Sequence, residues 1–464
     1  MGSERPRTAS ETDIQERGAG LTIRHGIRWD GRGRPRRTVR LAALLTALLA
    51  LGTPAVARAD SVDPVVADSM GRIAGGSGLA GPDGTGVDVA LVDSGVTPVG
   101  SLAEPGRVLH GPDFSAERLD PWLTELDTFG HGTHIAGLIA GYDPVTGFGG
   151  VAPGARLVSV KVAGADGVTS LGAVLSALDW IRFNGRRNGL NVRVVNLSLG
   201  VAGRDYRSDV LAHAVEQLWR AGFVVVAAGG NSGDSGPRVL DMPADDPFVI
   251  AAGATDTKQT VDPRDDRVAN FSSRSAWRPP DVVAPGTEMV SLRVPGSTLD
   301  HEFPAARTGG DAFFRGGGTS QAAAVTSGLA ARLLTRHPGL LPDQVKAMIR
   351  GGAVNIPADG HDAVGGGRID LARTLARPVP SVPSVRQTWP RSELNLRLLN
   401  RELRNDDRFD DDWDEEDERL LAQLARDGRH AGAVSAEWNG RRWSGRRWSG
   451  RRWSGATWIH DSDG

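Results

Sequence analysis

Four polar residues stand at positions from which they could do chemistry together. Asp93 follows an apolar run, and His131 lies just before a helical pattern. Asn231 follows a second apolar run, and Ser320 opens a stretch rich in small residues. A serine hydroxyl, a histidine that removes its proton and a carboxylate that orients the histidine form a nucleophilic set, and an amide can bind an oxyanion. The chemistry that these residue types indicate is acyl transfer.

Each residue alone has an ordinary structural explanation. Aspartate and asparagine at strand ends commonly form turns or caps, and serine at a helix start is commonly an N-cap. His131 and His134 could act as metal ligands, but no glutamate joins them in the pattern of a zinc peptidase. His134 is therefore interpreted as structural and His131 as a general base. Only the whole set, in the order Asp, His, Ser, favours a catalytic triad.

The elements that must position these residues alternate between strands and helices. Short β-rich apolar runs predict buried parallel strands at 87–92, 157–162, 192–199, 223–228 and 248–252. Amphipathic or small-residue patterns predict helices at 134–140, 171–184, 209–221, 319–335, 342–349 and 368–376. This rhythm predicts a three-layer α/β fold, with a doubly wound, mostly parallel sheet and helices on both faces.

Several segments around the candidate residues resemble motifs of the subtilisin-like serine protease family, the subtilases of peptidase family S8. They are 89–95, 131–137, 150–154, 195–200, 225–231, 283–286 and 318–320. The resemblance covers about residues 60 to 377. It implies a subtilisin-like fold and a secreted serine endopeptidase that works through an acyl-enzyme intermediate. Asp93, His131 and Ser320 would form its triad, with Asn231 as an oxyanion donor.

The resemblance also implies where the substrate binds. Two extended segments would form the edges and walls of the substrate site: Leu197, Ser198, Leu199 and Gly200, and Ala228, Gly229 and Gly230. Asp241 would lie at the base of the first specificity pocket, where the family often has glycine. A buried carboxylate there favours substrate lysine or arginine. An exposed loop aspartate is an equal alternative, because an unpaired carboxylate is costly to bury.

Composition limits the other chemistry open to the chain. The 464 residues carry a formal net charge of -2, which gives no bias toward nucleic acid as a partner. There is no cysteine, so disulfides, thiol catalysis and cysteine-based zinc sites are excluded. No cofactor is required by the expected mechanism. Calcium has no clear site, because Pro144 in the candidate loop 142–145 offers no side-chain oxygen.

The N-terminal region predicts export. Basic residues precede the apolar run 41–51 and a small-residue site, so residues 1–59 are interpreted as a signal peptide with a long leading region, cut after Ala59. The run would rise only about 16 Å as a helix, too short for a stable membrane span. A secreted or extracellular location follows, with attachment to the cell surface as a further expectation. A twin-arginine route and a misplaced start codon stay open.

The remainder divides into a peptidase domain at 60–377, a proline-rich linker at 378–390 and a charged, tryptophan-repeat tail at 391–464, for which we expect disorder. Protein or peptide substrates are the expected partners.

Two rival functions remain. A catalytically inactive binding or scaffold protein could keep the fold, since the family's usual Met-Ala-Ser-Pro after the serine is replaced here by residues 321–324. Alternatively, the tail could make contact with the cell envelope.

Overall fold

The computed structural model describes residues 71, 73, 81–201, 205–233, 238–356, 359–382, 391 and 392 of the chain. Contacts divide the chain into residues 1–60 and 61–464, and every element below belongs to the second unit. The predicted signal peptide, most of the linker and nearly all of the tail lie outside the described residues, so those assignments stay predictions. None of the helices in the described ranges is long and apolar enough to cross a membrane.

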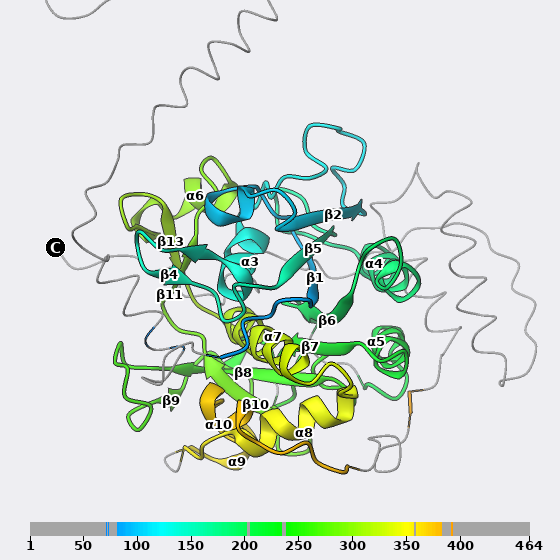
Figure 1. The fold of residues 1–464 in the computed structure, drawn as a ribbon, viewed down its shortest axis with the longest axis vertical. Coiled ribbons are helices and arrows are strands. Elements are labelled where there is room, and N and C mark those ends of the chain that lie inside the picture. Colours follow the sequence, from blue (N-terminus) through cyan, green and yellow to red (C-terminus); the bar gives the residue numbers. More distant parts are fainter. Residues whose placement is uncertain are drawn as a thin grey trace, which may run out of the picture. The chain divides into compact units, whose positions relative to one another are not determined.

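A central sheet of eight strands carries the fold, in the order β10-β8-β7-β6-β1-β5-β2, with β9 paired to β8 (Figure 1). All pairings are parallel except that of β9. The strands are β1 Asp88–Asp93, β2 Val108–Asp113, β5 Arg156–Lys161, β6 Val192–Leu197, β7 Val224–Ala228, β8 Ile250–Asp256, β9 Arg267–Val268 and β10 Val282–Pro285. Strand order reverses at β1, so a site is expected at its carboxyl end.

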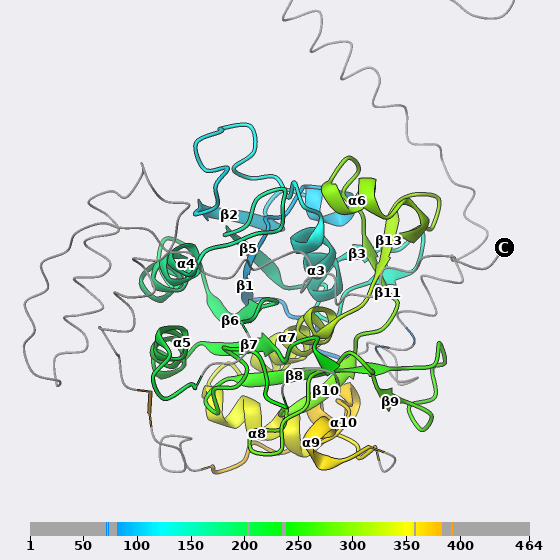
Figure 2. The ribbon, with the colours of Figure 1, turned by 180° about the vertical axis from the view of Figure 1, so that it is seen from behind.

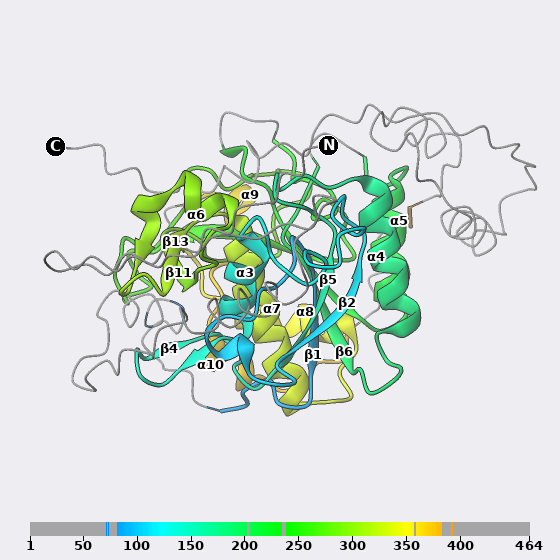
Figure 3. The same ribbon diagram turned by 90° about the horizontal axis from the view of Figure 1, so that it is seen from above.

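Helices cover both faces of this sheet. The principal ones are α3 His131–Ala140, α4 Leu171–Asn184, α5 Val210–Arg220, α7 Thr319–Arg336 and α8 Pro342–Gly352. Helices α3 and α7 pack on one face and α4 and α5 on the other (Figures 1 and 3). Figure 2 shows α4 and α5 side by side from behind. The expected three-layer fold is therefore confirmed.

Shorter elements frame the sheet. A hairpin joins β3 Tyr142–Asp143 to β4 Phe148–Gly149, and a small sheet combines β11 Met289–Leu292, β12 Arg307–Thr308 and β13 Phe313–Gly316. The short helices are η1 Gly100–Ala103, α6 Thr298–Glu302, η3 Pro304–Ala306, α9 His361–Val364 and α10 Leu371–Leu375. The strands of the small sheet are not among those predicted from the sequence.

The predicted boundaries differ from the structure at several element ends, and three of these differences have a local cause. Helix α3 begins at His131 rather than 134, because Gly130, with φ of 106°, turns the chain into the helix. The helix predicted from 368 begins only at Leu371, because Arg368 pairs with Val354 in a β-bridge. The strand predicted at 248–252 extends to Asp256, where β9 adds a partner.

Helix α7 is the central support of the candidate site. Almost all of it is buried, and its small residues let it approach its neighbours closely. A Cβ on Gly328 would lie 2.5 Å from Cβ of Val151, so glycine is needed where α7 crosses that segment. The 150–154 motif therefore has a packing role against the middle of α7.

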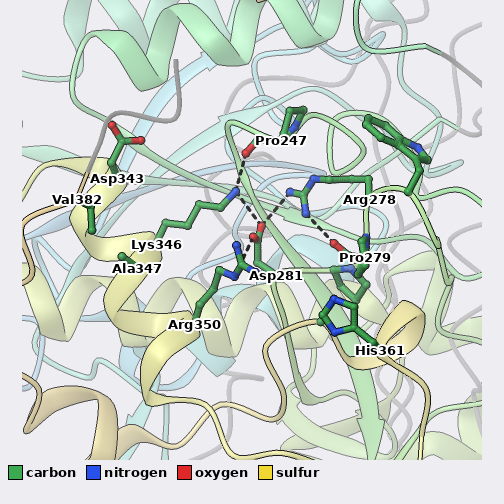
Figure 4. A pocket seen from close by; sticks show the side chains of 13 residues that line it. Pro247, Arg278, Pro279, Asp281, Asp343, Lys346, Ala347, Arg350, His361 and Val382 are labelled. Carbon is green, nitrogen blue, oxygen red and sulfur yellow. Dashed lines mark hydrogen bonds and ion pairs between the residues drawn. The ribbon is translucent and has the colours of Figure 1, made fainter. Parts of the chain in front are cut away.

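A buried cluster of charged side chains stabilises the sheet at the start of β10, which is the strand at one edge of the sheet. Asp281 accepts hydrogen bonds from the Ala251 amide and Arg278 at 2.9 Å, and Lys346 Nζ lies 3.0 Å from it. Figure 4 shows these cations and Arg350 pointing toward the carboxylate, at the wall of a cavity of about 250 Å³. Burial favours the protonated acid, but the cations outweigh it and lower the pKa of Asp281 to about 2.

Replacing this carboxylate should destabilise the whole domain. We expect Asp281→Asn to cost about 3 to 5 kcal/mol of unfolding free energy, because two buried cations lose their counter-charge. Urea unfolding measures the loss, which should shrink as the pH falls from 3.8 toward 2, where the native carboxylate takes up its proton. Asp262→Asn, in an exposed pair with Arg264, is the control and should change nothing measurable. An Asp281→Asn variant that is as stable as the native chain would contradict the stabilising role of Asp281.

Candidate active site

The candidate catalytic residues all lie at the carboxyl edge of the parallel sheet. Asp93 ends β1, and Ser198 directly follows β6. His131 is the first residue of α3, and Ser320 is the second residue of α7. Asn231 comes three residues after β7 ends. Because α3 packs against α7, residues far apart in the sequence meet at this edge.

Asp93 and His131 form a direct pair. Nδ1 of His131 lies 2.8 Å from Oδ1 of Asp93, and their side chains are only 3% and 1% exposed. Because a carboxylate oxygen accepts, Nδ1 carries a proton, and in the neutral imidazole the lone pair is then on Nε2. The Ser94 amide donates to the same Asp93 oxygen at 2.8 Å. Asp93 Oδ2 is buried, with no hydrogen-bond partner within the described ranges.

Asp127 fixes the start of α3, and sequence reasoning missed it. Its carboxylate accepts from the amides of Gly130 and Thr133, both at 2.7 Å. It also accepts from the Ser94 hydroxyl at 2.8 Å, so it links the turn before His131 to the end of β1. Burial raises the pKa of Asp127, and these hydrogen bonds oppose that shift. An aspartate four residues before a glycine-preceded histidine was the signal available in the sequence.

Ser320 lies where the first turn of α7 meets the end of β6. Its hydroxyl donates to the Ser198 carbonyl at 3.1 Å, and the Ser198 hydroxyl donates to the Ser320 carbonyl at 3.1 Å. The preceding Gly318 offers no side chain to cap the helix. Amides of a first helical turn point away from the helix, and their dipoles favour negative charge.

The orientation of Asn231 is set by Thr319. Oδ1 of Asn231 accepts from the Thr319 amide at 2.9 Å and from its hydroxyl at 3.0 Å. The Thr319 hydroxyl in turn accepts from the Gly230 amide at 3.1 Å. Because the Thr319 amide must donate, the end of the Asn231 side chain that it contacts is the oxygen. Nδ2 of Asn231 is therefore available to donate to another group. Thr319 was not singled out in the sequence.

Asp241 lies between the two segments expected to bind substrate. Its amide donates to the Gly229 carbonyl at 3.0 Å, and the residue is 6% exposed. A Cβ on Gly200 would lie 2.8 Å from Asp241 Cβ, and one on Gly230 would lie 2.8 Å from Asp241 Oδ2. The two glycines therefore make room for this side chain, and the exposed-loop alternative does not describe it.

The other expected substrate-binding residues differ in their positions. Leu197 is the last residue of β6, paired with Ala227, and its side chain is fully buried. From Ser198 the chain leaves the sheet, with Ser198 and Leu199 almost buried and Gly200 partly exposed. Ala228 ends β7, just before the two buried glycines at 229 and 230.

His134 and the candidate calcium loop have structural contacts of their own. His134 Nε2 donates to the Phe314 carbonyl at 3.1 Å, and burial, then the neighbouring His131, lowers the pKa of His134 to about 3. Asp143 accepts from the Val145 amide at 2.9 Å and the Thr146 hydroxyl at 2.8 Å, which closes its own turn. Among the residues described, no three side chains of metal-binding type gather together.

This fold and site define a class of enzyme. The model of the subtilase family, Peptidase S8, matches residues 84–372, and the chain belongs to that family. The expectation of a serine-type peptidase acting on proteins is therefore confirmed at the level of the family.

Individual relatives cover different shares of the chain. Serine protease AprX of Bacillus subtilis is 34% identical over 302 residues, which are 63% of this chain and 66% of AprX. Subtilisin DY of Bacillus licheniformis is 33% identical over 278 residues, 60% of this chain and 86% of subtilisin DY. The crystal structure of fervidolysin, a keratinolytic enzyme from Fervidobacterium pennivorans, matches with a TM-score of 0.53 and 28% identity. That match covers 65% of this chain and 44% of fervidolysin.

The Asp127 contacts predict a local effect on α3. In Asp127→Asn, the NH₂ group of the amide must face one of the N–H or O–H groups that now donate to the carboxylate. We therefore expect the free energy of unfolding to fall by about 1 to 3 kcal/mol. Hydrogen exchange at the amides of Gly130 and Thr133 should also become faster. Asp120→Asn is a suitable control, since the Asp120 side chain is exposed and accepts a hydrogen bond from the Trp122 amide in a surface turn. Unchanged protection of both amides would refute this role.

Proposed function

We propose that the chain is a secreted serine endopeptidase with Asp93, His131 and Ser320 as its triad. The observation that carries the proposal is the buried hydrogen bond of 2.8 Å between Asp93 and His131, at the edge where Ser320 lies in the first turn of α7. That bond keeps the proton on Nδ1 and the lone pair on Nε2, which is the state a general base requires.

The reaction follows from these roles. Nε2 of His131 takes the proton of the Ser320 hydroxyl as its oxygen attacks the peptide carbonyl carbon, and Asp93 stabilises the imidazolium that forms. The same proton passes to the leaving amine as the C–N bond breaks, which leaves an acyl-enzyme. Water then attacks the ester, again with His131 as base, and releases the second product with Ser320 restored.

Two donors would stabilise the oxyanion in both steps. One is the backbone amide of Ser320 at the start of α7, and the other is Nδ2 of Asn231. Thr319 supports this role because it engages Oδ1 of Asn231 twice, so the donor end of the amide does not need to reorient during the reaction. Such fixed dipoles stabilise developing charge without a reorganisation cost.

Specificity for lysine or arginine before the cleaved bond would come from Asp241. Its carboxylate lies against Gly200 and Gly230, at the level of the two segments that would hold the substrate backbone. A guanidinium or ammonium entering this space would gain a charge-assisted hydrogen bond in a site largely shielded from water.

Export and envelope contact complete the proposal. The pattern of residues 1–59 supports secretion with cleavage after Ala59, and the tail at 391–464 would provide contact with the cell envelope. Removal of residues 378–464 tests the second part. Retention on purified cell walls that is unchanged by this deletion would contradict it.

The triad is tested with the full chain and its Ser320→Ala variant on a peptide library. We expect cleavage to fall by roughly 10⁶ in Ser320→Ala, and Asn231→Ala to lower turnover by about 10² to 10³. A serine-directed phosphonate should label the native chain and not Ser320→Ala. A folded, processed chain that neither cleaves nor takes the label would favour the inactive scaffold instead.

The pocket assignment predicts a change in preference rather than in turnover. In Asp241→Asn, kcat/KM for substrates with lysine or arginine before the bond should fall by roughly 100-fold, because a charged partner is lost. Substrates with leucine there should be cleaved as before. Asp246→Asn, a buried aspartate of the same segment that accepts the Phe248 amide, is the matched control. A basic preference that survives in Asp241→Asn would make Asp241 purely structural.

A further inference from the structure

The side chain after the candidate nucleophile is an anomaly. Gln321 is fully buried, yet neither Nε2 nor Oε1 has a hydrogen-bond partner in the part of the chain that the structure describes. A buried amide without partners is costly, and most buried polar groups in proteins are paired. Because the side chain has no exposed surface, bulk water does not supply the missing partner, and a neighbouring polar group within reach of a small shift of Gln321 is the simpler candidate.

The position of Gln321 points to that group. Gly318 lies between Gln321 and Asn231, and a Cβ on Gly318 would be 3.0 Å from Gln321 Oε1 and 3.4 Å from Asn231 Nδ2. The two amides therefore lie on either side of the position that a side chain at 318 would occupy, and glycine there leaves no side chain between them. The end of Gln321 that faces it is an acceptor, and the end of Asn231 is a donor.

The contacts of Asn231 leave one of its side-chain N–H groups available to Gln321. Thr319 holds Oδ1 of Asn231 from its amide and its hydroxyl, so the plane of the amide is fixed at that end. Nδ2 carries two hydrogens, and one oxyanion uses only one of them. The second hydrogen is available to an acceptor across Gly318.

We propose that Gln321 is a positioning residue whose Oε1 accepts the second N–H of Asn231 as the oxyanion forms. The inference rests on the proposed function. When Nδ2 donates to a negatively charged oxygen, its other N–H becomes a stronger donor, so hydrogen bonds at the two hydrogens reinforce each other. Since Thr319 holds Asn231 in place, it is the Gln321 side chain that shifts to close the gap, and an interaction made only in the transition state raises kcat rather than lowering KM.

The test is a double-mutant cycle on the full chain, with kcat and KM measured on one peptide substrate. Gln321→Met keeps the length of the side chain but removes the amide, so we expect kcat to fall roughly 3- to 10-fold with KM unchanged. In the Asn231→Ala background, the same substitution should have no further effect, because its only partner is gone. Thr326→Val removes another buried polar group of α7 and should leave kcat unchanged.

The possible outcomes separate the inference from the function on which it rests. A native chain that fails to cleave removes both. An active native chain whose kcat is the same in folded Gln321→Met overturns the inference alone. If Gln321→Met lowers kcat by the same factor in the native and Asn231→Ala backgrounds, the inference is also overturned, because Gln321 would then act independently of Asn231. If Gln321→Met lowers kcat only when Asn231 is present, and leaves KM unchanged, the result supports the inference. Unfolding curves confirm that each variant is folded.

Discussion

The burial of one carboxylate constrains the rest of the active edge. Asp93 is almost completely removed from water at the end of β1, and an ionised group in that position requires donors around it. His131 and the Ser94 amide supply them. To hold His131 there, the chain needs a sharply defined helix start, and Asp127 provides it through the amides of Gly130 and Thr133. A second buried acid thus supports the first.

Close packing explains why glycine and alanine are so frequent around this edge. A Cβ on Gly132 would lie 2.1 Å from the Gly95 carbonyl oxygen, and one on Gly230 would overlap with Asp241. Strand ends and helix starts can approach this closely only without side chains. The same closeness brings Ser198 within hydrogen-bond distance of Ser320, across 122 positions of sequence. Small side chains permit the close approach, and hydrogen bonds then fix the positions of the candidate catalytic groups.

The sequence predicted the layers well and the support of the site poorly. Buried parallel strands leave continuous apolar runs, so β1, β5, β6 and β7 could be located within two residues. The candidate triad could be named because it stands at strand ends and helix starts. Asp127, Thr319 and Ser94 could not, because an aspartate in a loop or a threonine in a helix has many possible partners, and the partner depends on tertiary packing.

Buried polar groups lie at both edges of the sheet, and their surroundings differ. At the amino end of β10, Asp281 has an amide and cations around it, and Lys346 donates to two carbonyls as well. At the carboxyl edge, Asp93 Oδ2 and the Gln321 amide are buried without partners in the described chain. Buried atoms without a hydrogen-bond partner among the described residues also occur beside Asp281, at Arg278 Nε and Asp246 Oδ2, so such an atom alone does not mark a substrate site. What sets Asp93 and Gln321 apart is their place, since both lie at the edge where the candidate nucleophile lies in the first turn of its helix and where the proposed reaction would take place.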